Sequence, residues 1–140
     1  MTKTWRVVLL AVLVLMPGLA NAWRAMNRHE VYPVSDTVFE VLNEVGSGGV
    51  DYWCGAGDFA RQVMGTAAAQ RIYIWRGIGP SETRAGRKSV QFSLTAPQGA
   101  DTTPGLTLSI KHVGDNMTSA LAYQYCLGND PFDPFILRGG

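Results

Sequence analysis

The sequence predicts an α+β domain in which one helix packs on an antiparallel sheet of four or five strands. A single disulfide holds this domain, and a cleavable signal peptide precedes it. Three observations lead to the prediction. One segment, at residues 51–65, has apolar residues at helical spacing. Several later segments alternate apolar and polar residues as strands do, and the two cysteines, Cys54 and Cys126, enclose those segments.

Residues 1–22 have the pattern of a signal peptide. Lys3 and Arg6 precede an uninterrupted apolar run at residues 7–16, and a Pro-Gly break then leads to Ala20-Asn21-Ala22, an A-x-A cleavage pattern. A helix of that run would rise about 15 Å, half of the roughly 30 Å hydrocarbon thickness. We therefore expect cleavage and an exported protein, periplasmic or secreted. The alternative is a membrane-tethered accessory protein that retains this helix.

The remaining residues, 23–140, suit a single small domain. Removal of the leader would take away Lys3 and Arg6 and leave ten basic against eleven acidic side chains, a formal charge of −1. A nucleic-acid partner would favour a strongly basic face, so the sequence predicts no such partner.

Two cysteines in an exported chain predict one disulfide, because the compartment outside the inner membrane is oxidising. A bridge between Cys54 and Cys126 would close a long loop, and chain-entropy reasoning assigns it roughly 4 kcal/mol. The predicted bridge fastens the helix to the last strand of the sheet.

The mature chain begins with a segment of little periodicity, 23–33, which we interpret as a loosely held arm. The density of β-branched and aromatic residues over 34–45 favours a strand, and its apolar residues on both faces indicate that it is central or covered on both sides. The sequence Gly46-Ser47-Gly48-Gly49 ends it.

The helix follows, with Asp51 as the expected N-cap and Gly65 as the stop. Gly55 and Gly57 each disfavour a helix interior by roughly 0.8 to 1 kcal/mol, so the regular helix is expected to begin as late as Ala56. Cys54 would then lie at or near the helix N-terminus.

Strands are predicted at 71–76 and 88–95, joined by a loop at 77–86 into a hairpin. The alternation of Leu106, Leu108 and Ile110 with polar residues is the cleanest period of two in the chain and predicts another strand.

The segment 117–126 fits both a strand and a helix. We favour a strand, because it would close a meander with short connections. The tail 127–140 contains Pro131, Pro134 and two terminal glycines, and is predicted to be irregular, with its apolar residues able to dock on the sheet.

Cys54 and His112 are the candidate catalytic pair. The sequence Trp53-Cys54-Gly55-Ala56 at the start of a helix resembles that of bacterial cell-wall peptidases, which use a Cys so placed together with a His on a following strand. The resemblance implies a cysteine hydrolase acting on envelope peptides. A disulfide with Cys126 would remove the nucleophile and is the preferred interpretation. On the face of Leu106, Leu108 and Ile110, His112 is expected to be partly buried.

The hairpin loop carries the most polar stretch of the sequence. Its basic and hydroxyl side chains could converge on an anion or a partner, and the alternative is an exposed charged hairpin tip. The candidate residues are Arg76, Ser81, Thr83, Arg84, Arg87 and Lys88.

His29 is expected to be solvated in the arm. The two histidines lack metal-ligand spacing, so the sequence predicts no metal site, and it indicates no cofactor. The aromatic side chains are assigned to core packing, with an exposed partner-binding patch as the alternative.

Together these features predict a small exported domain that binds an envelope protein or a small ligand without catalysing a reaction. The cysteine hydrolase and the tethered accessory protein are the two alternatives. Membrane contact is expected only where the leader is retained.

Overall fold

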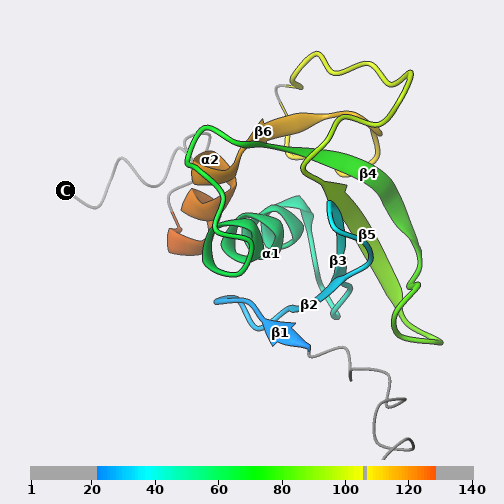
Figure 1. The fold of residues 1–140 in the computed structure, drawn as a ribbon. Coiled ribbons are helices and arrows are strands. Elements are labelled where there is room, and N and C mark those ends of the chain that lie inside the picture. The colour runs from blue at the N-terminus through cyan, green and yellow to red at the C-terminus, as the bar shows by residue number, and fades with distance from the viewer. Residues whose placement is uncertain (1–21, 106, 129–140) are drawn as a thin grey trace, which may run out of the picture.

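The computed structural model describes residues 22–105 and 107–128. The predicted leader, apart from Ala22, and the tail beyond Gly128 lie outside the described residues. One antiparallel sheet holds six strands in the order β1-β2-β3-β5-β4-β6. The helix α1 packs on one face of this sheet, and a second helix, α2, lies beside α1 (Figure 1). The α+β class and the antiparallel sheet are confirmed, but the sheet has one strand more than predicted and a second helix packs with the first.

The bounds of the elements are as follows. The strands are β1 (Trp23–Arg24), β2 (Glu30–Pro33), β3 (Val38–Leu42), β4 (Arg71–Pro80), β5 (Lys88–Ser93) and β6 (Asn116–Thr118). The helices are α1 (Gly49–Gln62), α2 (Ser119–Gln124) and the 3-10 helix η1 (Tyr125–Leu127).

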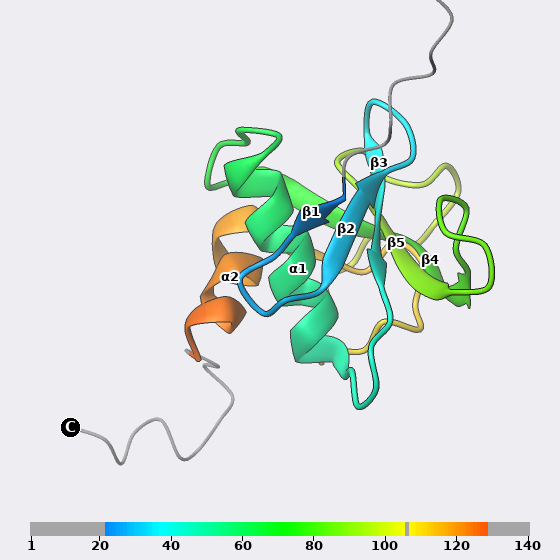
Figure 2. The ribbon, with the colours of Figure 1, turned by 90° about the horizontal axis from the view of Figure 1, so that it is seen from below.

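The segment 23–33 is not a loose arm. It forms β1 and β2, which pair with each other, and β2 continues onto β3. The turn between them is anchored on α1, because the Met26 N–H donates to Asp58 Oδ2 at 2.7 Å and Asn27 Nδ2 donates to the Asp51 carbonyl at 2.9 Å. Figure 2 shows this hairpin running alongside α1. Strands of two and four residues are too short for an alternation of apolar and polar residues to be recognised in the sequence.

The central strand β3 was predicted well. All five of its residues are buried, as expected for a strand covered on both faces. Phe39 and Val41 belong to the core under α1, together with Val90 and Phe92 of β5. The alternate residues of β3 and β5, including Glu40, point to the opposite face.

The helix α1 begins earlier than predicted. Its N-cap is Gly48, and Asp51 lies in the first turn, where its Oδ2 accepts the Gly48 N–H at 2.8 Å. Cys54 therefore lies inside the helix rather than at its N-terminus. Gly55 and Gly57 are close-packing positions: a Cβ would lie 2.9 Å from Val41 Cγ1 at Gly55 and 2.6 Å from the carbonyl carbon of Ala122 at Gly57. The two glycines let the sheet and α2 approach α1, and this packing outweighs their low helix propensity.

The predicted hairpin of β4 and β5 is confirmed, although β4 runs on to Pro80 and two register shifts interrupt its pairing. Such bulges bend a strand and re-aim its side chains.

Two strand predictions near the C-terminus are wrong. The alternation of Leu106, Leu108 and Ile110 predicts a strand, but residues 107–111 form none and lie as an irregular loop against β4 and the start of α1. Leu108 and Ile110 still pack on the core, so the alternation reflects one-sided burial without strand pairing. In the segment 117–126, only the first two residues belong to β6. Thr118 then caps α2 by accepting the Leu121 N–H at 3.2 Å.

Candidate functional site

The predicted disulfide is present. Cys54 and Cys126 are bonded, with their Cα atoms 4.8 Å apart, and the Sγ of Cys126 also lies 3.2 Å from the Cys54 carbonyl oxygen. Cys126 belongs to η1, so the bridge joins α1 to the helical segment at the C-terminal end instead of joining α1 to a strand. The close approach of α1 and α2 at Gly57 brings the two cysteines together.

The candidate catalytic pair does not form a nucleophile and base. The side chain of Cys54 is buried and its sulfur is bonded to Cys126, so it cannot supply the thiolate that a cysteine hydrolase requires. His112 is exposed on the loop that follows Ile110, which contradicts its predicted burial on a strand face. His112 instead helps to line a surface hollow, described below.

The polar residues of the hairpin converge on a carboxylate of the chain itself. Glu40, at the centre of β3, is completely buried on the face away from α1. Its side chain accepts hydrogen bonds from the hydroxyls of Ser81 and Thr83 and from the backbone N–H of Thr83 at 3.0 Å. From the neighbouring strand β5, Ser89 Oγ donates to the same carboxylate at 2.8 Å and Gln91 Nε2 at 3.2 Å.

This set of donors determines the charge state of Glu40. Burial raises the pKa of its carboxyl, but the hydrogen bonds from Ser81, Thr83, Ser89 and Gln91 outweigh that effect and lower the pKa from 4.5 to about 2. The carboxylate is therefore ionised at neutral pH. It holds the hairpin loop against the sheet.

The basic side chains of the hairpin are distributed around Glu40 rather than gathered at one point. Arg76 Nη2 lies 2.8 Å from Ser89 Oγ and 3.9 Å from Glu40 Oε2. Arg84 Nη1 donates to the Tyr32 hydroxyl at 2.9 Å, and its guanidinium lies 5.8 Å from the centre of the Tyr32 ring.

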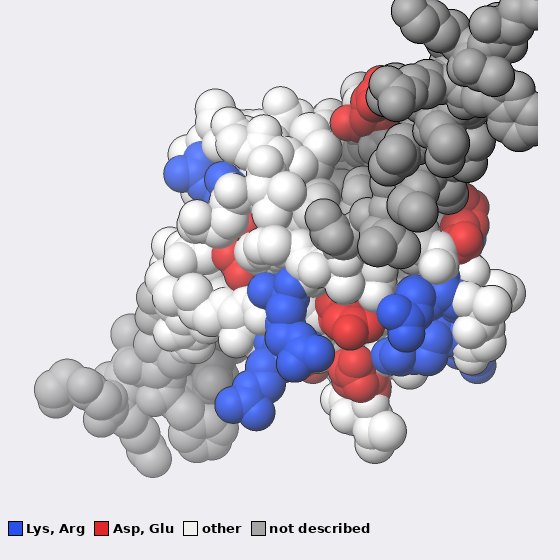
Figure 3. Space-filling view, turned by 60° about the horizontal axis from the view of Figure 1, so that its bottom comes forward, with Lys and Arg blue, Asp and Glu red and all other residues white. Residues whose placement is uncertain are grey.

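The other two basic residues of the predicted set lie further along the loop. Arg87 pairs with Glu44 at 3.2 Å, and Lys88, at the start of β5, is exposed. Figure 3 shows basic side chains on both sides of acidic ones on one face of the molecule, without an extended patch of one sign. The proposed external anion site therefore remains a prediction, and most of its donors contact internal acceptors.

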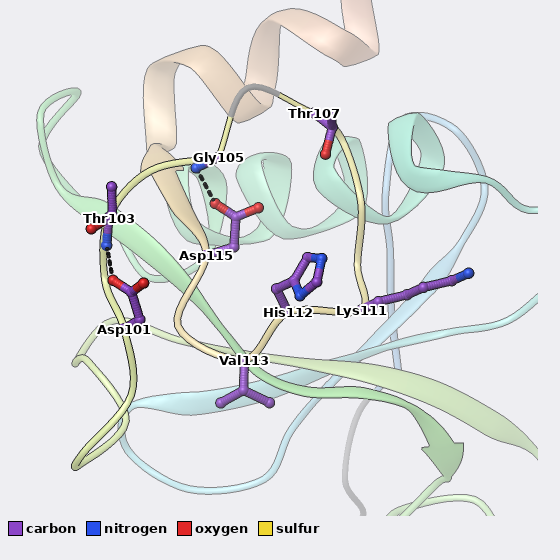
Figure 4. Close-up of a pocket in the computed structure, with 8 residues that line it drawn as sticks. All are labelled: Asp101, Thr103, Gly105, Thr107, Lys111, His112, Val113 and Asp115. Atoms are coloured by element: carbon purple, nitrogen blue, oxygen red, sulfur yellow. Dashed lines mark hydrogen bonds between the residues drawn. The ribbon is translucent and has the colours of Figure 1, made fainter.

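A hollow of about 370 Å³ lies in the irregular segment between β5 and β6. Asp101 and Thr103 line it from the outgoing limb of the loop, and Lys111, His112 and Asp115 from the returning limb (Figure 4). The carboxylate of Asp115 and the imidazole of His112 extend into the space between the limbs, whereas Val113 points away from it. The hollow thus combines carboxylates, hydroxyls, an imidazole and the ammonium group of Lys111.

Asp115 fixes the shape of this hollow. The residue is 7% exposed, and its Oδ1 accepts the Gly105 N–H at 2.7 Å and the Asn116 N–H at 2.8 Å. A side chain at Gly105 would meet Asp115, since a Cβ would lie 2.8 Å from Oδ2. At the outer rim, the N–H of Thr103 donates to Asp101 Oδ1 at 2.9 Å, and this bond lowers the pKa of Asp101.

Sequence reasoning missed two buried acidic side chains, Glu40 and Asp115. Glu40 was not predicted because a single acidic residue within an apolar strand matches no sequence motif. Asp115 is not among the candidate residues of the sequence, because a single acidic residue beside a glycine is typical of any turn. A charged residue in an otherwise buried strand was the available signal for Glu40, because charges are almost never fully buried without partners.

His29 also differs from its prediction. It is buried, and its Nε2 lies 2.7 Å from Ser47 Oγ. Of the aromatic residues, Tyr52 and Trp53 are fully buried, whereas Trp75 remains 39% exposed on β4. Core packing thus explains the first two, and Trp75 belongs to the surface.

Comparisons with known proteins give no assignment: no family model matches the chain, and neither the curated proteins nor the solved structures contain a match. Across residues 22–105 and 107–128, no helix has the length and apolar character needed to cross a membrane. In the same part of the chain, no group of three or more His, Cys, Asp or Glu side chains is arranged to hold a metal ion.

Proposed function

We propose that this protein is an exported, disulfide-fixed binding domain of the bacterial envelope, and that it binds a small polar ligand in the hollow of residues 101–115. The observation that carries the proposal is the hollow itself, with the Asp115 carboxylate and the His112 imidazole extending into it. Ligand sites are concave and combine a few convergent polar groups with a rigid frame. The proposed ligand is one of the two predicted kinds of partner, a small molecule or an exposed group of an envelope protein.

The two carboxylates of the lining favour a ligand that carries hydrogen-bond donors, and Lys111 adds a donor of its own to the same lining. Asp101 and Asp115 provide acceptors, and Thr103 and Thr107 provide hydroxyls on the same walls. An ammonium or hydroxyl group of the ligand would find these acceptors. The disulfide supports the exported location, because such bonds persist in oxidising compartments.

Binding is tested by NMR titration of the oxidised chain with three probes: glucosamine, glucose and alanylalanine. Glucosamine differs from glucose by an amine, and alanylalanine carries an amine without the sugar hydroxyls. We expect an amine-bearing probe to shift the backbone amide signals of residues 101–115, and His112→Gln to weaken that response. Lys88→Gln is the matched control, since Lys88 is an exposed polar residue of the hairpin. Unchanged 101–115 signals with all three probes would reject this ligand class.

Export is tested separately by N-terminal sequencing of the mature protein. A start at Trp23 is expected from the Ala20-Asn21-Ala22 cleavage pattern. Recovery of a chain that begins at Met1 in the membrane fraction would favour the tethered accessory protein instead.

A further inference from the structure

A second hollow, of about 220 Å³, adjoins the first and has a different character. The two hollows share a wall, which is formed by Gly105, Thr107 and Asp115. The rest of the second lining is largely apolar and comes from the irregular loop, β6 and the helical segment after it: Leu108, Met117, Leu121 and Tyr125. The volume is below the roughly 300 to 1,000 Å³ of sites for drug-sized ligands, so it suits one large apolar side chain.

The shared wall carries a negative charge on Asp115. Its Oδ1 accepts the Gly105 N–H at 2.7 Å. Figure 4 shows this oxygen turned toward Gly105 and the other oxygen turned toward the space between the limbs of the loop. The side chain of Lys111 extends away from Asp115 in the same view. An ammonium group of a ligand can therefore pair with a carboxylate that is largely buried, and such a charge-assisted hydrogen bond is stronger than a neutral one.

Gly105 keeps the carboxylate accessible from the second hollow. A Cβ at this position would lie 2.8 Å from Asp115 Oδ2 and 3.1 Å from Oδ1. Because glycine has no side chain, a ligand that extends from one hollow into the other can pass beside the backbone of the loop and meet the carboxylate there.

Arg71 sets the direction in which such a ligand binds. It lines the second hollow and not the first, and its Nη1 donates to Asn116 Oδ1 at 2.9 Å. Its positive charge disfavours an amine at this end of the site. A guanidinium has several N–H donors, so Arg71 can also donate to a carbonyl oxygen. The charges thus place an amine beside Asp115 and leave the apolar hollow for an uncharged group.

We propose that the two hollows together bind the N-terminal residue of a peptide when that residue has a large apolar side chain. Its α-amine pairs with Asp115, its side chain lies against Met117 and Leu121, and its carbonyl oxygen accepts a hydrogen bond from Arg71. The inference rests on the proposed function, because it assigns a ligand class to the same site. The first hollow supplies the partner of the amine, and the second selects the side chain.

The test is an NMR titration of the full oxidised chain with phenylalaninamide, alaninamide and 3-phenylpropanamide. Alaninamide lacks the phenyl ring, and 3-phenylpropanamide lacks the amine. We expect phenylalaninamide to shift the amide signals of residues 101–115 and the methyl signals of Met117 and Leu121 together. It should bind about tenfold more tightly than either of the other probes, because each of them loses either the burial of the ring or the charge-assisted hydrogen bond.

Two variants locate the two parts of the ligand. Leu121→Ala should weaken phenylalaninamide more than alaninamide, and Leu127→Ala is the matched control, because Leu127 is an exposed leucine of the same helical segment that lies outside both linings. Asp115→Asn keeps an oxygen for the Gly105 and Asn116 N–H groups and should remove the preference for phenylalaninamide over 3-phenylpropanamide. The comparison of the probes on the wild-type chain covers the case in which Asp115→Asn disturbs the loop.

The possible failures separate this inference from the proposed function. Equal affinity for phenylalaninamide and alaninamide, with shifts confined to residues 101–115, would overturn the inference and leave the polar site in place. Equal affinity for phenylalaninamide and 3-phenylpropanamide would also overturn it, because the amine would then contribute nothing. A response to glucosamine without one to phenylalaninamide rejects the apolar specificity alone, whereas no response to any of these probes rejects the proposed function as well.

Discussion

Replacement of Glu40 by glutamine is the sharpest test of the carboxylate that holds the hairpin. The change preserves the shape of the side chain and removes its charge. The buried carboxylate accepts hydrogen bonds at both oxygens, so an amide would place its own N–H groups against donors such as Ser89 Oγ. A buried donor that faces other donors is left unsatisfied.

The magnitude follows from the pKa of Glu40. A fall from 4.5 to about 2 on folding corresponds to a stabilisation of the ionised form on the order of 3 kcal/mol. This contribution is fully present above the unfolded-state value near 4.5. It is lost as the pH falls from there through the folded-state value near 2, because the unfolded chain then binds the proton first.

Urea denaturation of the oxidised chain measures the effect. At pH 7 we expect Glu40→Gln to lower the free energy of unfolding by about 3 kcal/mol, and the gap from the wild-type chain to shrink as the pH is lowered from 4.5 toward 2. Glu44→Gln is the control, because Glu44 is half exposed and pairs with Arg87 at the surface. Its effect should stay below about 1 kcal/mol. Equal effects of the two variants at pH 7, or a Glu40→Gln gap that does not change with pH, would refute the reasoning.

Three further predictions concern the helices. Replacing both Cys54 and Cys126 by Ala should lower the free energy of unfolding by about 4 kcal/mol, measured by urea denaturation, and the unreduced wild-type chain should show no thiol that reacts with an alkylating agent. Gly57→Ala should destabilise the chain by about 1 to 3 kcal/mol in thermal melts, because its Cβ would lie 2.6 Å from the carbonyl carbon of Ala122. Gly48→Ala is the control. Its Cβ would have its nearest neighbour at 4.0 Å, so this change should alter stability by less than about 1 kcal/mol. Thr118→Ala removes the N-cap of α2 and should lower stability by about 1 kcal/mol, and an unchanged melting temperature would contradict the cap.

The parts of the fold that were predictable are those where one local rule dominates. Side-chain type and the expected compartment predict a buried strand within 34–45, which the structure places at Val38–Leu42. They also predict the hairpin strands that begin at Arg71 and Lys88, and the disulfide. The predicted start of α1 is too late because Gly55 and Gly57 have low helix propensity. In the structure these glycines allow Val41 and α2 to approach α1 closely. Propensity is a weak prior that tertiary packing overrides.

The C-terminal third shows a different limit. Leu108 and Ile110 alternate with polar residues because one side of the segment rests on the core, but no neighbouring strand pairs with it. Period-two alternation reports which side is buried and does not report whether a backbone partner exists. The strand predicted at 117–126 depended on the strand predicted from Leu106, Leu108 and Ile110, because the two would have closed a meander. Thr118, a residue type that caps helices, was the available signal in favour of α2, and its side chain accepts the Leu121 N–H.

The distribution of polar partners also decides where binding chemistry can lie. The buried carboxylate of Glu40 is surrounded by Arg76, Ser81, Thr83 and Ser89. The polar stretch of the hairpin therefore mainly holds the hairpin loop against the sheet. The irregular segment 101–115 leaves a hollow that Asp101, His112 and Asp115 help to line. Polar groups that satisfy one another cannot also bind a ligand without losing those bonds. This side of the molecule, rather than the hairpin, is therefore where a ligand is expected to bind.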